Sequence, residues 1–164
     1  DITVSGGNIA VSGTNARFLN SDYVGTAGSN IQIRMNHHIT FQHVELKTSG
    51  PSSGVGGEIS VWSDSDGDDV GRIFSDGFFC ISTVTECNAS VSVAPQTGGA
   101  NIWVGGGLSS TSNAFSPPGG SPSTGSNPGV SFATLGQPRI FSGGGEISIA
   151  SETASSTAGI HGQV

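Results

Sequence analysis

The sequence predicts an all-β protein, and three observations support this class. Helix-forming runs are nearly absent from the 164 residues, which include 27 glycines and 7 prolines. Short segments rich in β-branched residues alternate apolar and polar side chains, which is the period of a strand with one buried face. Glycine or proline separates these segments, as tight turns require. We therefore expect short strands joined by glycine-rich turns.

Six segments carry the strand pattern most clearly. Each begins with isoleucine or valine and returns to an apolar residue two positions later: 31–35, 39–43, 59–61, 91–93, 102–104 and 147–149. Irregular spacing between the segments and long Gly/Ser/Pro loops favour a β-sandwich or jelly-roll-like architecture. The alternative is a right-handed parallel β-helix.

A phrase of two glycines followed by a polar residue and a strand recurs along the chain. The four copies begin at Gly6, Gly56, Gly98 and Gly144. Repeats of about this length are typical of stacked β-coils. A pair of glycines is also a common way to begin a strand after a turn, and the uneven separations favour this second interpretation. Residues 72–75 and 139–142 share the sequence Arg-Ile-Phe-Ser, a further internal echo.

The glycine phrase, Gly-Gly-x-Ile-x-Val with serine and asparagine between strands, resembles bacterial surface β-helix adhesins of the filamentous haemagglutinin type. The resemblance rests on the four short copies and covers about a fifth of the chain. It implies a secreted, non-catalytic surface protein and assigns no role to any single residue.

Charge excludes several classes of partner. Only 10% of the residues are charged, the formal net charge is −7, and lysine and arginine together number 5. Nucleic-acid binding needs clustered basic residues, which are missing here. No apolar run approaches the ~20 residues of a membrane-spanning helix. The start at Asp1 is interpreted as a mature chain from which a signal peptide has been removed.

Two cysteines, Cys80 and Cys87, bracket a six-residue segment. In an exported protein such a pair most often forms a disulfide, here across a hairpin or tight corner. We therefore expect an oxidising, extracellular or cell-surface location. Asn88 begins an Asn-Ala-Ser triplet, a formal N-glycosylation sequon that matters only in a eukaryotic secretory route.

An acidic segment is the sharpest local signal for a ligand. It contains Asp64, Asp66, Asp68 and Asp69. Alternating aspartates in a flexible turn can supply the several oxygen ligands that calcium prefers. The glycine position and the absence of a closing glutamate depart from the helix-loop-helix calcium pattern. The alternative is a solvated acidic loop that binds no metal. Ca²⁺ is the one cofactor that the sequence suggests.

Nothing in the sequence assembles into a catalytic constellation. Serines are abundant, but none lies in a nucleophile elbow between a strand and a helix. His37, His38 and His43 lie close in sequence, but on an extended strand they are too far apart or face opposite sides. We therefore predict a non-enzymatic protein, with an unrecognised carbohydrate-active enzyme as the alternative.

Two tryptophans suggest a contact surface. Trp62 follows Val61, and Trp103 lies between Ile102 and Val104, so each faces outward if its apolar neighbours face the core. Exposed aromatic side chains mark contacts with carbohydrate or with another subunit. The alternative is that both strands are buried on both faces.

The N-terminal residues 1–11 look like a strand donated to a neighbouring molecule. They alternate, lie at a free end, and carry the apolar residues Ile2, Val4, Ile9 and Val11 that would fill sockets in the next subunit. Residues 12–164 then form one all-β domain, in which 105–129 is a Gly/Ser/Pro-rich loop. The arrangement resembles, in outline, the donor-strand pilus subunits of bacteria and archaea.

The sequence thus predicts a secreted structural subunit that assembles with copies of itself into a fibre, pilus or surface layer by β-strand addition. Its physical basis is that strand edges with few charges are open to pairing. The alternative function is an extracellular carbohydrate-binding or adhesin module, stabilised by calcium.

Overall fold

The computed structural model describes residues 2–5, 9–26, 29–48, 56–66, 71–75, 77–83, 100–106, 130–132, 139–142, 145–149 and 160–161. Within these ranges the chain forms strands and no helix, which confirms the all-β class. The strands are β1 (Ile2–Ser5), β2 (Ile9–Gly13), β3 (Ala16–Thr26), β4 (Ile31–Met35), β5 (Ile39–Lys47), β6 (Ile59–Ser63), β7 (Ile73–Ser75), β8 (Phe79–Ser82), β9 (Ile102–Gly106), β10 (Val130–Phe132), β11 (Arg139–Phe141), β12 (Ile147–Ile149) and β13 (Ile160–His161).

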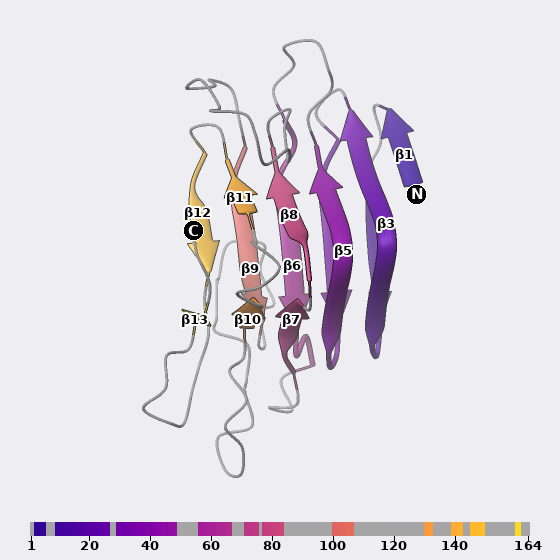
Figure 1. Cartoon of the computed structure of the whole chain (residues 1–164), viewed down its shortest axis with the longest axis vertical. Helices are drawn as coiled ribbons and strands as arrows, with labels where there is room; N and C mark the ends of the chain where they lie inside the picture. The colour runs from indigo at the N-terminus through magenta and orange to yellow at the C-terminus, as the bar shows by residue number, and fades with distance from the viewer. Residues whose placement is uncertain are drawn as a thin grey trace.

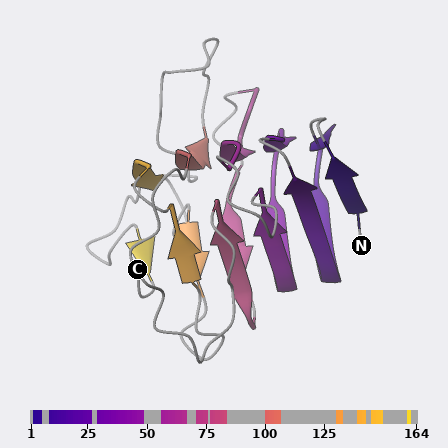
Figure 2. The same cartoon turned by 90° about the horizontal axis from the view of Figure 1, so that it is seen from above.

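The strands form two sheets, and every described pairing is parallel. The five-stranded sheet has the order β12-β9-β6-β4-β2. The eight-stranded sheet runs from β1 through β3 to β5, and β5 pairs with both β7 and β8. One branch continues from β7 through β10 to β13, and the other from β8 to β11. From β2 to β6 the chain alternates between the sheets. We call one strand of the five-stranded sheet, together with the strand or strands of the eight-stranded sheet that follow it, a circuit. Each strand pairs with the equivalent strand of the next circuit. Figures 1 and 2 show these strands side by side, from β1 near the N-terminus to β12 and β13.

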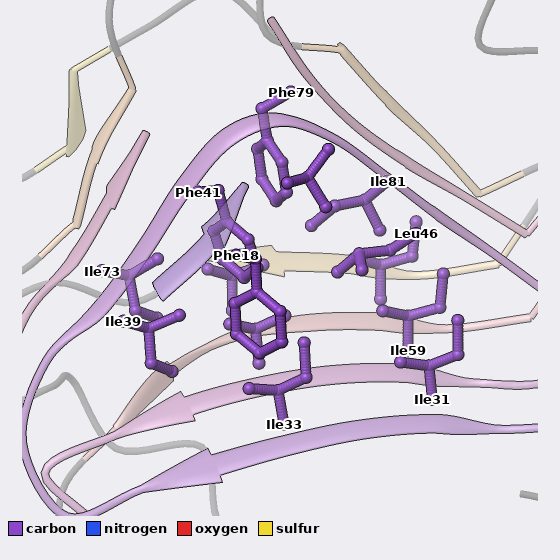
Figure 3. Close-up of a cluster of buried hydrophobic side chains, with 14 of the residues drawn as sticks. Phe18, Ile31, Ile33, Ile39, Phe41, Leu46, Ile59, Ile73, Phe79 and Ile81 are labelled. Atoms are coloured by element: carbon purple, nitrogen blue, oxygen red, sulfur yellow. The ribbon is translucent and has the colours of Figure 1, made fainter. Parts of the chain in front are cut away.

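The eight-stranded sheet is interrupted at one position in successive strands. Asn20 in β3 and His43 in β5 have left-handed backbone angles, with φ of 47° and 55°, and the pairing register skips both. Beyond them the next circuit is split into β7, which pairs with the start of β5, and β8, which pairs with its end. Gly77, between β7 and β8, has φ 108° and lies against the His43 ring. This sheet therefore has two halves, and β5 curves around the core between them (Figure 3).

The core is built from columns of matching residues. Along the five-stranded sheet, Ile31, Ile59 and Ile102 are paired in register and fully buried. The second column of this sheet contains Val11, Ile33, Val61, Val104 and Ile149. Parallel in-register pairing places the same position of each circuit above the last, so one apolar residue type suits every level. Burial on this scale contributes roughly 25 cal/mol per Å² of apolar surface.

Aromatic rings fill the core on the side of the eight-stranded sheet. The ring centroids of Phe18 and Phe41 are 5.2 Å apart, and those of Phe41 and Phe79 are 4.4 Å apart, with both pairs stacked. Tyr23 meets Phe18 edge to face at 5.3 Å. These rings come from β3, β5 and β8, so this aromatic stack joins three successive circuits (Figure 3).

Buried hydroxyl groups satisfy the backbone where the chain passes from one sheet to the other. Thr48 Oγ1 donates to the carbonyl oxygen of Gly57 at 2.6 Å. Thr83 Oγ1 donates to the carbonyl of Ser142 at 2.8 Å and accepts from the amide of Ala100 at 3.2 Å. A Cβ on Gly56 would lie 2.2 Å from the Thr83 carbonyl oxygen. In this copy the glycine phrase therefore begins where the backbone of Thr83 lies too close for a side chain.

The parallel pairing bears on the predicted architecture. Sandwiches and jelly rolls are built from antiparallel ladders, whereas the described ladders are all parallel. The predicted strands 31–35, 59–61, 102–104 and 147–149 coincide with or lie within β4, β6, β9 and β12, and 39–43 is the first part of β5. Residues 91–93 lie outside the described ranges. Of the predicted loop 105–129, Gly105 and Gly106 belong to β9 and the remainder is outside these ranges.

The two internal echoes differ in meaning. The four glycine phrases lead into β2, β6, β9 and β12, which all belong to the five-stranded sheet. The strands that follow the four phrases thus belong to one sheet, which agrees with a structural repeat, while most of the glycines themselves lie outside the described residues. β4 is an equivalent strand that lacks the two glycines. The echo between 72–75 and 139–142 joins unlike strands, since β7 pairs with β10 whereas β11 pairs with β8.

Replacing the central ring of the aromatic stack is expected to destabilise the fold strongly. Phe41→Ala removes a fully buried side chain and should lower the free energy of unfolding by about 3–5 kcal/mol. Leu19→Ala in β3 is the matched control, because Leu19 is 43% exposed and should change it by no more than about 0.5 kcal/mol. Urea unfolding followed by circular dichroism measures both; equal effects would contradict the central place of the stack.

Candidate functional site

The outer face of the five-stranded sheet carries two rows of side chains that point away from the core. The first row follows the register through Ala10, Gln32, Ser60, Trp103 and Ser148. The second row contains Ser12, Arg34, Trp62 and Gly105. Because pairing is in register, each row is a straight line across the sheet. The rows place both tryptophans on this face, as the alternation of the sequence predicts.

The two tryptophans differ in accessibility. Trp62 is only 9% exposed, so the expectation of an open indole at this position is wrong. Its strand, β6, lies in the middle of the sheet and is buried from Val61 to Ser63. Trp103 is half-buried and has serine hydroxyl groups on both sides, from Ser60 and Ser148. Of the two, Trp103 is the aromatic residue that can meet a ligand or another molecule.

The two ends of the strand stack form a second candidate site. β1 and β2 are the end strands at the N-terminal side; at the other side β12 ends the five-stranded sheet, and β11 and β13 end the two branches of the eight-stranded sheet. Three apolar residues at the first end, Val11, Ala16 and Tyr23, are only partly buried against the core. At the other end, Ile147 and Ile149 are likewise only partly buried. Core residues thus retain exposure at the places where the stack stops.

The predicted donor segment lies against its own chain. β1 pairs with β3, with Ile2 beside Tyr23 and Val4 beside Gly25. Ile9 is 5% exposed and belongs to the chain's own core, while Val11 packs at its margin. In this chain the segment therefore forms the first strands of the stack, and what it offers a neighbour is its outer edge.

The acidic segment is described in part. Asp64 is buried at the end of β6 with a left-handed φ of 52°, and Asp66 is exposed. Asp68 and Asp69 lie outside the described residues. Over the part of the chain that the structure describes, no three acidic, histidine or cysteine side chains come together to hold a metal ion. Calcium binding stays a prediction.

Other predicted residues are also described only in part. Cys80 is fully buried in β8, and its predicted partner Cys87 lies outside the described ranges, so the disulfide stays a prediction. Asn88, the predicted glycosylation site, is outside them as well. None of the described residues forms a helix that is long and apolar enough to cross a membrane.

His37, His38 and Arg72 form a cluster just before strands β5 and β7, which we call the cationic corner. The sequence pattern did not predict that these three residues come together. The rings of His37 and His38 lie 6.2 Å apart, just before β5. Arg72, from the following circuit, accepts a hydrogen bond from the Ile39 amide through its carbonyl, and its guanidinium lies 5.7 Å from the Phe74 ring centroid. Arg72 lies near the histidines because β7 pairs in register with β5. This proximity follows from the strand pairing and leaves no local signal in the sequence.

Electrostatics at this corner disfavour a charged His38. Burial lowers the pKa of His38 below its ordinary value of 6.5, and the positive charges of Arg72 and His37 lower it further. The described members of this cluster are two histidines and one arginine. Comparisons with family models, with curated proteins and with solved structures find no match to this chain.

His38 should make stability depend on pH. Its folded-state pKa is lowered, so between that value and about 6.5 the unfolded chain binds more protons than the folded chain. Stability is therefore expected to be retained above pH 6.5 and to fall as pH drops below it. His38→Asn should reduce this dependence, measured as the urea midpoint at pH 5.5 and 7.5, whereas His43→Asn at the exposed position should preserve it. An unchanged pH profile in His38→Asn would contradict the assignment.

Proposed function

We propose that the protein is a secreted, non-enzymatic structural subunit, and that copies of it assemble into an extracellular fibre or surface layer by strand addition. The single observation that carries the proposal is that the described strands pair in parallel, one beside the next, and that the first and last of them are edge strands. We also infer that its architecture is a parallel β-helix.

The β-helix is supported by the order of the pairings. β2, β4, β6, β9 and β12 stack in chain order in one sheet, while the intervening strands stack in the other. The interruption at Asn20 and His43 divides the second sheet into two halves, which suits a coil with three sides. Stacked β-coils have their hydrogen bonds along the stack, so each end presents unpaired backbone groups.

The edge of β2 is well suited to accept another strand. The Ile9 amide donates to the carbonyl of Asn30, the residue before β4, at 2.9 Å, so the amides of Ala10 and Ser12 point to the opposite, outer edge. No lysine, arginine or acidic residue occurs in the sequences of β1, β2 or β12. Natural edge strands are commonly protected by charge or proline, and these sequences carry neither. The cysteine pair supports an extracellular location.

Proline at an outward-pointing amide should block assembly without removing an internal hydrogen bond. Ala10→Pro takes a donor from the outer edge of β2 and leaves the Ile9 bond in place. We expect the variant to keep its circular dichroism spectrum and to remain monomeric at concentrations where the unaltered chain forms fibres. Light scattering after size exclusion and negative-stain imaging measure this result.

The matched control is Ala10→Thr, which keeps the backbone donor and a strand-forming side chain. It should assemble like the unaltered chain. If Ala10→Pro assembles equally well, or if the unaltered chain is a monomer at every concentration, the proposal of strand addition at β2 is wrong.

The second candidate function is carbohydrate binding, and the half-buried Trp103 favours it. Its indole lies in a row of polar side chains on a sheet face, with Gln32 two strands away. Aromatic rings flanked by hydroxyl and amide groups can stack on sugar rings and hydrogen-bond to them. This function is compatible with assembly, since the face and the strand edges are different surfaces.

Trp103→Ala should weaken binding if the face recognises carbohydrate. The expected loss is about tenfold or more in affinity for the bound polysaccharide, found by screening a glycan array and quantified by calorimetry. Leu19→Ala, on the eight-stranded sheet, is the control and should bind normally. No binding by the unaltered chain to any glycan on the array would reject this candidate.

A further inference from the structure

The two ends of the strand stack carry matching residues in the same core columns. Ile9 and Val11 begin the two columns of the five-stranded sheet, and Ile147 and Ile149 end them. Val11, Ile147 and Ile149 are among the partly buried residues at the margin of the core. Among the described strands, each end of this sheet therefore lacks a neighbouring strand of the kind that the other end presents.

We infer that copies of this chain join head to tail, with β12 of one molecule pairing in parallel with β2 of the next. The register that continues both columns places Ile147 beside Ile9 and Ile149 beside Val11. The outward pair is then Ser148 with Ala10. This inference rests on the proposed function and specifies the partner, the polarity and the register of the assembly.

A polar column beside the first apolar column supports the same polarity. Its described members alternate between asparagine and glutamate: Asn30, Glu58, Asn101 and Glu146. The Glu58 amide donates to Asn30 Oδ1 at 2.8 Å, and the Glu146 amide donates to Asn101 Oδ1 at 3.0 Å.

The bond between one Asn–Glu pair and the next is of a different kind. Asn101 Nδ2 lies 3.4 Å from Glu58 Oε1, as a donor to the carboxylate. The column ends on Glu146, and the sequence places Asn8 before Ile9. In sequence, head-to-tail joining therefore continues the alternation, because an asparagine position follows the glutamate at the end of the column.

Joining two N-terminal ends lacks these features. A twofold contact between two copies of β2 is antiparallel, so it cannot continue the parallel columns. It also leaves the carboxylate of Glu146 away from the contact. A head-to-tail contact is heterologous and does not close on itself unless it curves into a ring, so it produces an extended filament.

Mixed cysteine cross-linking tests the polarity and register. Two single variants, A10C and S148C, are prepared separately, mixed under assembly conditions and mildly oxidised. Both positions face outward, and in the inferred register their Cα atoms are one strand spacing apart, within disulfide reach. We expect a dimer on a non-reducing gel from the mixture, with a peptide bridging positions 10 and 148 identified by mass spectrometry, and no dimer from either variant alone.

The matched control replaces A10C with S12C. Ser12 shares the outer face of β2 but lies about 7 Å farther along the strand, beyond disulfide reach of position 148. It should give about tenfold less cross-linked dimer. Dimer from A10C alone, or equal yields from A10C and S12C mixtures, overturns the inference. Fibres without the mixed cross-link also overturn it and leave the proposed function standing, whereas monomers in every sample overturn both.

Discussion

The parallel, in-register backbone ladder is the constraint on which the rest of the structure depends. It fixes each strand to the equivalent strand one circuit later, as in the pairing of Ile31 with Ile59 and of Ile59 with Ile102. Equivalent residues must then stack, so the core becomes columns of isoleucine and valine and a line of phenylalanine rings. The same ladder aligns the outward rows, which positions Trp103 between serines, and it leaves hydrogen-bonding edges where the stack stops.

Much of the strand content could be predicted because a half-buried strand imprints its period on the sequence. The alternation in residues 31–35 is matched by a burial pattern that alternates at every residue of β4. The glycine phrases also carried information about the circuits. Their spacing is uneven because the connections between circuits differ in length, while the position of Gly56 is fixed by its close approach to Thr83.

The direction of pairing and the depth of burial could not be predicted in the same way. Alternation gives the face of a residue but not its partner strand, and so it could not distinguish antiparallel from parallel sheets. Trp62 takes the outward position that its neighbours imply and is nevertheless only 9% exposed, a depth of burial that the alternation of the sequence does not indicate. Arg72 and His38 are 34 positions apart, and they meet only because β5 and β7 are one circuit apart. Ile9 packs in the core of its own molecule, whereas the sequence-based prediction placed it in the core of a neighbouring molecule. An apolar strand residue has the same sequence pattern in both cases.

The distance between positions 10 and 148 tests the stacked arrangement most directly. Both lie in the same outward row, separated by four strand spacings, which corresponds to about 19 Å between Cα atoms. Spin labels at these two positions, measured by pulsed electron paramagnetic resonance with an excess of unlabelled chain, report the distance within one molecule. We predict a single narrow distribution around four strand spacings. A distribution centred elsewhere by more than the reach of the two labels would contradict the stack.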